Sequence, residues 1–198
     1  MLAVESDLPT VNTLVTRRHF ESIKGMYRTP VTAIYLEQPL SRMLALISTT
    51  LPERDRITIL LGPSSKHMEH ELSEICVTQK LNCAAMAVDD PSGIEQVLQF
   101  AGLHGKVVLV LPDQAIVNAS TARNLILGAY RRGVALVGYS SALVKAGALM
   151  SVHSTPEELG EDATLMAVDW LKRQAASMPP ARYPEIFSVA VNYQLARA

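Results

Sequence analysis

Ile57-Thr-Ile-Leu-Leu-Gly-Pro63 is a short apolar run that ends at Gly-Pro, and such a run predicts a strand buried on both faces. Similar apolar runs recur at residues 83–88, 107–111 and 134–137. A stretch with the apolar spacing of a helix follows each of these runs. Buried strands that alternate with helices predict a parallel sheet covered on both faces, so residues 57–145 are expected to form one complete doubly wound lobe.

The helices of this lobe have recognisable ends. A polar helix is expected at residues 65–80, and Asp90-Pro91 opens the next one. Asn118 or Ser120 can cap the third helix, and Gly133 ends it. A further helix precedes the lobe after Gln38-Pro39, because its apolar residues recur with helical spacing. Those residues are Leu40, Met43, Leu44, Ile47 and Leu51.

The most distinct helix signal lies downstream, at Thr155-Pro-Glu-Glu158, where a capping box has Pro at the first helical position. The helix is expected to run to about residue 174, with one apolar stripe. The stripe consists of Leu159, Ala163, Met166 and Trp170. Strands are expected at residues 11–15, 32–35 and 187–191, and another helix near residues 17–24.

The C-terminal third carries a longer signature. Val134-Ala-Leu-Val-Gly-Tyr-Ser-Ser-Ala-Leu-Val-Lys-Ala-Gly-Ala-Leu-Met-Ser-Val-His153 leads into Thr155-Pro-Glu-Glu-Leu-Gly160, and Phe187-Ser-Val-Ala-Val-Asn192 comes near the end. These residues resemble the C-terminal signature of the ABC-transporter substrate-binding proteins. The resemblance covers the chain from about Val31 to its end.

The resemblance implies an α/β type I periplasmic-binding-protein-like fold, in which two doubly wound parallel-sheet lobes enclose a cleft. Residues 1–37 and 148–198 would form lobe I, and residues 38–147 lobe II. Glu37-Gln-Pro39 would cross into the second lobe and Ala146-Gly-Ala148 would return to the first. Lobe I is shorter than the family pattern, so we expect it to be incomplete, with the N-terminal part of the family's chain missing.

The implied function is solute binding for an ABC-type uptake system. The chain would capture a small organic molecule, such as an aromatic or amino-acid-like solute, by hinge closure and present it to a membrane permease. The alternatives are a ligand-sensing regulatory module of the same fold and a Ser-dependent hydrolase. Family members work outside the cytoplasm, so a periplasmic or extracytoplasmic location is expected, although the N-terminal residues lack the pattern of a signal peptide.

Composition excludes several other classes. Eighteen Lys and Arg against 19 Asp and Glu leave no basic excess for nucleic acid, and no window has the roughly 20 apolar residues of a membrane span. No dinucleotide or nucleotide fingerprint is present, so no cofactor is expected. His67 and His70 lack a third ligand, so a solvated helix face is favoured over a metal site. Cys76 and Cys83 are expected to be small apolar residues rather than a bridge.

Candidate ligand-binding residues follow the expected strands, because ligands of open α/β sheets sit beyond the carboxyl ends of the strands. From the second lobe we expect Asp113, Gln114, Asn118, Tyr139, Ser140, Ser141, Ser64 and Ser65, and from the crossover Tyr35 and Gln38. His153 is a weaker candidate. Tyr139 could stack on a ring, and the hydroxyls could donate or accept hydrogen bonds.

Each candidate also has a purely structural interpretation. Asp113 and Asn118 could order their own loop, the serines could cap helices, and Tyr139 could pack at the lobe edge. A Ser140, Asp113 and His153 set would be needed for hydrolysis, but Ala142 stands where a nucleophile elbow needs Gly. A short first lobe would leave apolar edges uncovered, which favours a homodimer.

Overall fold

The computed structural model describes residues 7–54, 56–173 and 177–197. The chain divides into two compact units. One comprises Met1–Pro39 and His153–Ser188, and the other comprises Leu40–Val152 and Val189–Ala198. We call them unit 1 and unit 2 and describe each by itself.

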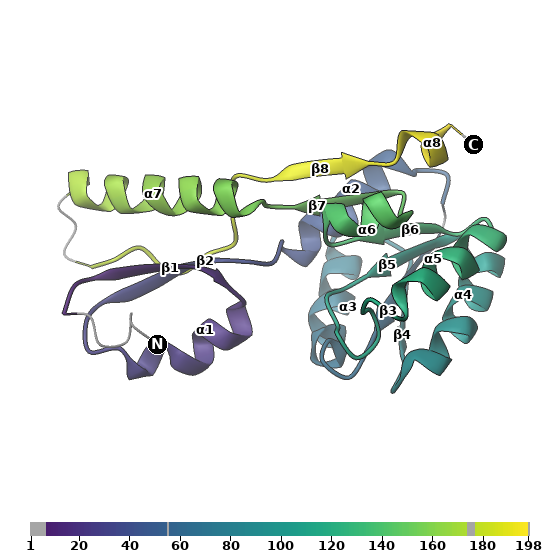
Figure 1. Ribbon diagram of the computed structural model, residues 1–198, viewed down its shortest axis with the longest axis horizontal. Helices are drawn as coiled ribbons and strands as arrows, with labels where there is room; N and C mark the ends of the chain where they lie inside the picture. The colour runs from purple at the N-terminus through teal and green to yellow at the C-terminus, as the bar shows by residue number, and fades with distance from the viewer. Residues whose placement is uncertain (1–6, 55, 174–176, 198) are drawn as a thin grey trace. The chain divides into compact units, whose positions relative to one another are not determined.

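Unit 2 is built on a sheet of six strands in the order β4-β3-β5-β6-β7-β8 (Figure 1). The strands are β3 (Ile57–Leu61), β4 (Cys83–Ala87), β5 (Val107–Val110), β6 (Ala135–Gly138), β7 (Met150–His153) and β8 (Ser188–Val191). Every pair from β4 to β7 is parallel. The four apolar runs of the sequence therefore form neighbouring parallel strands, as predicted.

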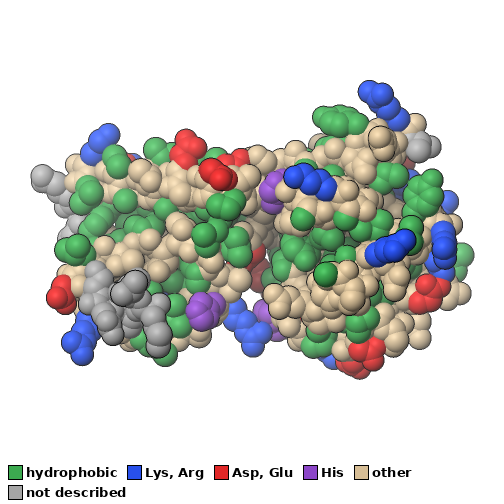
Figure 2. Space-filling model, viewed as in Figure 1, with side chains coloured by type: hydrophobic (Ala, Val, Ile, Leu, Met, Phe, Trp, Pro, Cys, Tyr) green, Lys and Arg blue, Asp and Glu red, His purple; other side chains and the backbone are tan. Residues whose placement is uncertain are grey.

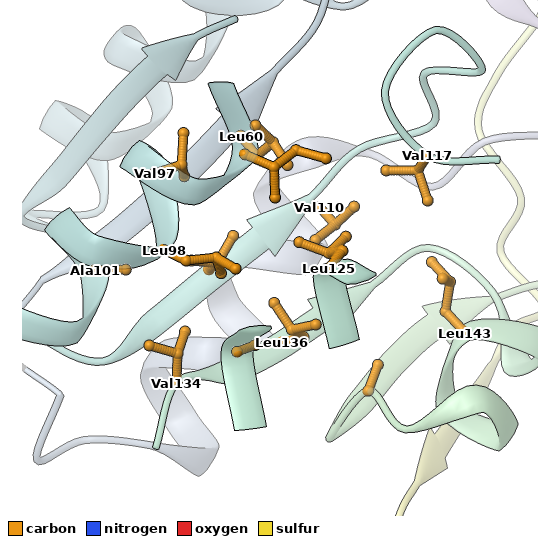
Figure 3. Close-up of a cluster of buried hydrophobic side chains, with 14 of the residues drawn as sticks. Leu60, Val97, Leu98, Ala101, Val110, Val117, Leu125, Val134, Leu136 and Leu143 are labelled. Carbon is orange, nitrogen blue, oxygen red and sulfur yellow. The ribbon is translucent and has the colours of Figure 1, made fainter. Parts of the chain in front are cut away.

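Helices cover both faces of this sheet, which confirms the doubly wound fold. They are α2 (Leu40–Thr50), α3 (Glu69–Thr78), α4 (Ile94–Leu103), α5 (Ala122–Arg131) and α6 (Ser141–Ala146). A short terminal helix, α8 (Tyr193–Ala196), has no buried residue. Short 3-10 turns, η3 (Lys66–Met68) and η4 (Pro91–Gly93), precede α3 and α4. On one face Leu98 and Leu125 pack with Leu60 and Val110 (Figure 3). On the other, residues of α2 and α3 cover the opposite side chains of the same strands.

Unit 1 contains the parallel pair β1 (Thr10–Val15) and β2 (Val31–Tyr35). Its helices are α1 (Arg17–Ile23), the 3-10 turn η2 (Lys24–Met26) and α7 (Pro156–Arg173). In Figure 1, α7 and α1 lie on opposite sides of the two strands. Ile34 packs with Leu159 and Met166 of α7, whereas Phe20 of α1 packs with Ala33 and Tyr35. The predicted end of α7 at residue 174 lies outside the described residues.

The predicted capping box of α7 is confirmed. The Glu158 N–H donates to Thr155 Oγ1 at 3.2 Å, and the Thr155 N–H donates to Glu158 Oε2 at 2.8 Å. The other oxygen, Oε1, accepts a hydrogen bond from the Ser188 hydroxyl. The start of α7 is therefore bonded to Ser188, the last residue of unit 1.

The boundaries of the units differ from those expected for the two lobes. We expected the chain to leave lobe II at residues 146–148 and to keep everything after it in lobe I. Instead, β7 pairs with β6, and β8 lies next to β7 in the same sheet. Residues 148–152 and 189–198 therefore belong to unit 2. The first segment of unit 1 ends at Pro39, which lies within the crossover expected at Glu37-Gln-Pro39 and two residues after the expected end of lobe I.

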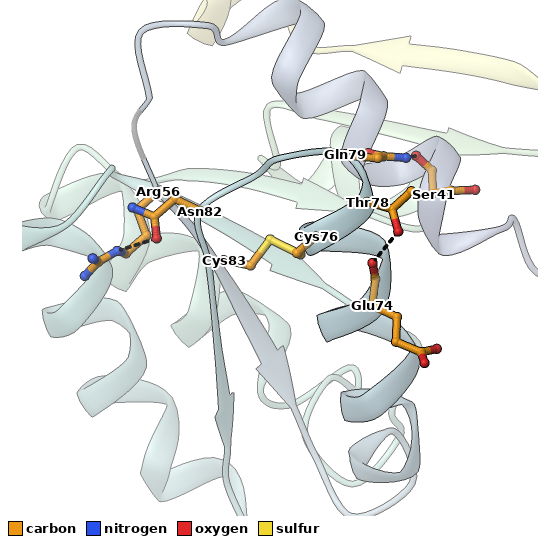
Figure 4. The surroundings of a disulfide bond; sticks show 8 residues. All are labelled: Ser41, Arg56, Glu74, Cys76, Thr78, Gln79, Asn82 and Cys83. Carbon is orange, nitrogen blue, oxygen red and sulfur yellow. Dashed lines mark hydrogen bonds between the residues drawn. A yellow bond between two sulfur atoms is a disulfide. The ribbon is translucent and has the colours of Figure 1, made fainter.

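The expectation for the cysteines was wrong. Cys76 and Cys83 form a disulfide with a Cα–Cα distance of 6.2 Å. The bond joins the last turn of α3 to the first residue of β4 (Figure 4). Because the chain reverses direction immediately after α3, residues seven positions apart become neighbours.

Candidate functional site

Three loops of unit 2 meet at one edge of the sheet. They follow β3 (residues 62–65), β5 (residues 112–118) and β6 (residues 139–141). Because these three strands are adjacent and parallel, their carboxyl ends lie at the same edge. Eight of the ten predicted binding residues belong to these loops.

Asp113 joins the first loop to the second. Its Oδ2 accepts hydrogen bonds from the Ser64 N–H at 2.9 Å, the Ser65 N–H at 3.0 Å and the Ser65 hydroxyl at 2.9 Å. Its Oδ1 accepts from the Ala115 N–H at 3.2 Å. Only 4% of Asp113 is exposed. The carboxylate thus occupies the position in which a bound anion would satisfy the same N–H groups.

Gly62 allows the two loops to approach each other. A Cβ added to Gly62 would lie 2.2 Å from Ile116 Cγ1 and 2.5 Å from Asp113 Oδ2. The Gly62 N–H also donates to Ser65 Oγ at 2.8 Å. Any other residue at this position would therefore push the loops apart.

Tyr139 and Ser140 lie at the end of β6. Tyr139 is half-buried and packs at the margin of both hydrophobic cores of unit 2. Burial raises the pKa of its phenol, and the negative charge of Asp113 raises that pKa further. Ser140 caps α6, since its hydroxyl accepts from the Leu143 N–H at 3.4 Å. Ser141, partly exposed, is the first residue of α6.

Asn118 orders its own loop, as its structural interpretation predicted. Its Oδ1 accepts from the Ser120 and Thr121 N–H groups at 3.0 and 3.2 Å, and its Nδ2 donates to the Gln114 carbonyl at 3.1 Å. Gln114 is exposed at the loop surface. Asn118 therefore shapes the segment that leads into α5.

The last two predicted residues, Tyr35 and Gln38, belong to unit 1. The Tyr35 ring lies 5.4 Å from the Tyr183 ring and 6.2 Å from the Phe20 ring, and 6% of the residue is exposed. Burial raises the pKa of the Tyr35 phenol, with Glu21 adding to it. Gln38 Nε2 donates to Ser154 Oγ at 2.8 Å, and that hydroxyl donates to the Ile186 carbonyl at 2.7 Å. Both side chains have structural partners within unit 1.

One structural ion pair of unit 1 was missed by the sequence reasoning. Asp162, 1% exposed, accepts from Arg182 Nη2 at 2.6 Å and from the Glu185 N–H at 2.7 Å. It holds residues 182–185 against α7. The only sequence signal was that Asp162 stands next to Ala163, a member of the apolar stripe of α7. That signal does not identify Arg182 as the partner of Asp162.

The strand-end loops offer hydroxyl and aromatic groups rather than anion-binding N–H groups. Asp113 already uses the N–H groups of Ser64 and Ser65, whereas Ser64 and Gln114 are exposed and Tyr139, Ser140 and Ser141 are partly so. Within residues 7–54, 56–173 and 177–197, no three His, Cys, Asp or Glu side chains are grouped to hold a metal. No helix in these ranges is both long enough and apolar enough to cross a membrane.

The model of the ABC transporter substrate binding protein family matches residues 5–197. The chain therefore belongs to this family. A search of curated proteins found no match to it.

Solved structures show the same fold. A substrate-binding protein with adhesive properties from Clostridium difficile, in a ligand-free open structure, matches 96% of this chain with a TM-score of 0.74 and 18% identity. The ABC domain from Streptococcus pneumonia in complex with L-Trp matches 96% with a TM-score of 0.68 and 21% identity. A conserved domain protein from Vibrio cholerae matches 84% with a TM-score of 0.63 and 16% identity. The chain spans 66%, 66% and 57% of these structures, respectively.

Proposed function

We propose that this chain binds a small organic solute for an ABC-type uptake system. The observation that carries the proposal is the edge of unit 2 where Asp113 fixes two strand-end loops beside Tyr139, in a chain of the substrate-binding family. This edge is where parallel α/β sheets bind ligands. The expected closure about a hinge, and the transfer of solute to a membrane permease, stay predictions that follow from the family.

The chemistry of the loops favours a ring-bearing or amine-bearing solute over a simple anion. The N–H groups of Ser64 and Ser65 already donate hydrogen bonds to Asp113, so they are not available to a bound anion. The carboxylate of Asp113 also adds a negative charge near the site. Tyr139 offers a face for stacking, and Ser140, Ser141 and Ser64 offer hydroxyls. The Streptococcus structure, which holds L-Trp, is consistent with an aromatic amino acid as the first candidate.

The disulfide supports a location outside the cytoplasm. Bonds between cysteines persist in the periplasm and at cell surfaces, whereas the cytosol keeps thiols reduced. The Cys76–Cys83 bond therefore fits the extracytoplasmic location that the family implies.

On the face seen in Figure 2, Lys and Arg side chains are interspersed with Asp and Glu, so this face has no basic patch suited to nucleic acid.

Thermal unfolding with a panel of amino acids, nucleosides, sugars and amines tests the proposal. A ligand that binds only the folded state adds about 2.7 kcal/mol at a hundredfold excess over its Kd, so one chemical class should raise Tm. Tyr139→Ala should abolish that shift, because it removes the aromatic face. Tyr130→Ala, an exposed tyrosine on α5, is the matched control and should keep the shift.

Isothermal titration with the best compound then separates binding from stability. If a compound that raises the Tm bound the Tyr139→Ala variant with the same Kd as the wild type, the assignment of the site would be contradicted. An absence of any hit across the panel would contradict solute binding by this chain.

A further inference from the structure

One carboxylate oxygen of Glu37, in unit 1, is buried and unused. Glu37 is the second residue after β2, and its Oε1 accepts a hydrogen bond from the Arg17 N–H at 2.7 Å. Its Oε2 has less than 1 Å² of accessible surface and, among the described residues, no hydrogen-bond partner. Buried polar atoms almost always have a partner, so this oxygen requires an explanation.

The fully buried carboxylates of the described chain differ from Glu37 in this respect. Asp113 and Asp162 are almost inaccessible, and both oxygens of each accept hydrogen bonds. The other buried side-chain atoms without a partner in the described ranges are the hydroxyls of Thr32 and Thr58. A hydroxyl is neutral, whereas a carboxylate oxygen shares a negative charge and costs more to bury alone. The unused oxygen of Glu37 is therefore the most costly of these atoms.

The backbone beside Glu37 is strained. Leu14 has a φ of 57°, and a bulge interrupts β1 between Asn12 and Val15. This left-handed conformation is unfavourable for a residue with a Cβ. The Val15 carbonyl accepts from the Leu36 N–H at 2.9 Å, so the bulge lies against the residue that precedes Glu37. Strained residues and bulges occur often at binding sites, where they direct nearby groups.

Glu37 also lies at the edge where the sheet of unit 1 would bind a ligand. Because β1 and β2 are parallel, the segments that follow them, residues 16–18 and 36–38, leave the sheet at the same edge. Ligands of parallel α/β sheets sit beyond this edge. Glu37 as a whole residue is partly exposed, so its carboxylate lies close to the surface. The predicted residues Tyr35 and Gln38 flank Glu37, but the sequence reasoning did not select Glu37 itself.

The unused oxygen needs a hydrogen-bond donor that also carries a positive charge. Arg17 gives its N–H to Oε1, but its guanidinium Nη1 donates to the Tyr183 hydroxyl at 3.2 Å. An ammonium group is compact and has three N–H donors. Hydrogen bonds between an ammonium and a carboxylate are about twice as strong as those between neutral groups. An ammonium group therefore suits this oxygen better than a neutral hydroxyl does.

We propose that Glu37 binds the ammonium group of the solute through Oε2, which narrows the solute to a primary amine such as an α-amino acid. This inference rests on the proposed function, because it names the charged group of the same solute. It adds a binding residue of unit 1 to the loops of unit 2. Glu37 then determines specificity, since it favours amines over sugars and over carboxylates that lack an amine.

Thermal unfolding without added solute tests whether Oε2 serves binding rather than the fold. Glu37→Gln retains the carbonyl oxygen that accepts from the Arg17 N–H and replaces the charged oxygen by a neutral amide. Its Tm should be about 2–4 °C above that of the wild type, because a buried charge without a partner is removed. Asp162→Asn is the matched control and should lower the Tm, since both oxygens of Asp162 are bonded. A lower Tm for Glu37→Gln would show that the charge stabilises the fold and would overturn the proposal.

Isothermal titration with L-Trp and with indole-3-propionate, the same molecule without its amino group, tests the ammonium contact. The wild type should bind L-Trp about tenfold more tightly than indole-3-propionate, or better. Glu37→Gln should raise the Kd for L-Trp about 10–100-fold, as expected for the loss of a bond between charged groups, and leave the Kd for indole-3-propionate unchanged. Glu161→Gln, at an exposed position of α7, is the control and should bind both compounds like the wild type. Any other amine that raises the Tm is compared with its own analogue without the amino group.

Failure of this inference differs from failure of the proposed function. If the compounds that bind the wild type lack an amino group, Glu37 is not an ammonium site, although solute binding stands. The same conclusion follows if Glu37→Gln binds L-Trp, or the amine identified in its place, with the Kd of the wild type. If no compound of the panel binds, both the inference and the proposed function are wrong.

Discussion

At the scale of single residues, the close approach of two loops depends on the absence of one side chain. A Cβ at Gly62 would overlap Ile116 and the Asp113 carboxylate. We expect Gly62→Ala to lower the free energy of unfolding by about 1–3 kcal/mol, the usual cost of overpacking a tight site. Urea unfolding followed by circular dichroism measures it.

Gly160→Ala is the matched control for this substitution. Gly160 lies inside α7, and an added Cβ would meet nothing within 4 Å. It should therefore raise stability by about 0.5–1 kcal/mol, because Ala loses less backbone freedom on helix formation. Equal effects of the two substitutions would contradict the steric argument.

Asp113 is expected to stabilise the folded conformation of its loop, whether or not it also contacts a ligand. Asp113→Ala leaves the N–H groups of Ser64 and Ser65 without their acceptor, and Ser65 is 1% exposed. We expect a loss of about 3 kcal/mol in unfolding free energy, since the bonds involve a charged acceptor. Asp89→Ala removes an exposed carboxylate and should change stability little. A stable Asp113→Ala variant would mean that water replaces the carboxylate.

The sequence identified the loops but not the contacts within them. Asp113 and Ser64 were selected because each follows a buried strand, and topology alone brings such residues to one edge. The hydrogen bond between Ser64 and Asp113 depends on the backbone conformation of two loops, in residues 49 positions apart, which no local pattern encodes. The same limit applies to Tyr35, whose aromatic neighbour Tyr183 is remote in sequence.

At the scale of elements, the start of α7 carries a pH-dependent contact. The Ser188 hydroxyl and then the Thr155 N–H hold the pKa of Glu158 below its ordinary value. A carboxyl with a lower pKa in the folded state stabilises the fold above its unfolded-state pKa, and this contribution disappears as pH falls through the folded-state pKa. The cap therefore acts at neutral pH and weakens in acid.

Glu158→Gln should accordingly destabilise the protein by about 1 kcal/mol near neutral pH, the usual value of a helix cap, and by progressively less in acid. Unfolding by urea at a series of pH values measures the difference. Glu157→Gln changes the neighbouring exposed carboxylate and is the control. A difference that stays constant with pH would show that the charge of Glu158 contributes nothing.

The disulfide stabilises the connection from α3 to β4. It closes a short loop, so its removal should cost about 2 kcal/mol through the greater freedom of the unfolded chain. Reductant should lower the Tm of the wild type. The double variant Cys76→Ala with Cys83→Ala should start from the lower Tm and be insensitive to reductant. A wild type that melts identically with and without reductant would contradict this.

Elements with strong local signals were predictable. The five buried residues of β3, the apolar spacing of α2 and the capping box of α7 each carry their own pattern. Local patterns could not predict that the two cysteines pair. They also could not predict that β7 belongs to the six-stranded sheet of unit 2. Both depend on which segments lie side by side after folding, and β7 is a four-residue strand with no turn signal to mark its partner.

At the scale of the whole molecule, the two units differ in how much sheet they contain. Unit 2 holds six strands, and β3 and β5 are buried at every position. Unit 1 has a two-stranded sheet, in which no residue of β1 is fully buried. Two-stranded sheets are marginal unless helices pack on them, as α7 and α1 do here. The units should therefore differ in local stability.

Hydrogen exchange should show this difference directly. Amides of β3 and β5 should exchange slowest, through global unfolding, and amides of β1 and β2 should exchange faster, through opening of unit 1 alone. Ile59→Ala, at a fully buried position, should lower protection in β3 and β5 by about 2–5 kcal/mol. The same substitution should leave β1 and β2 unchanged if unit 1 opens by itself. Equal protection of all these strands would instead show that both units unfold as one cooperative body.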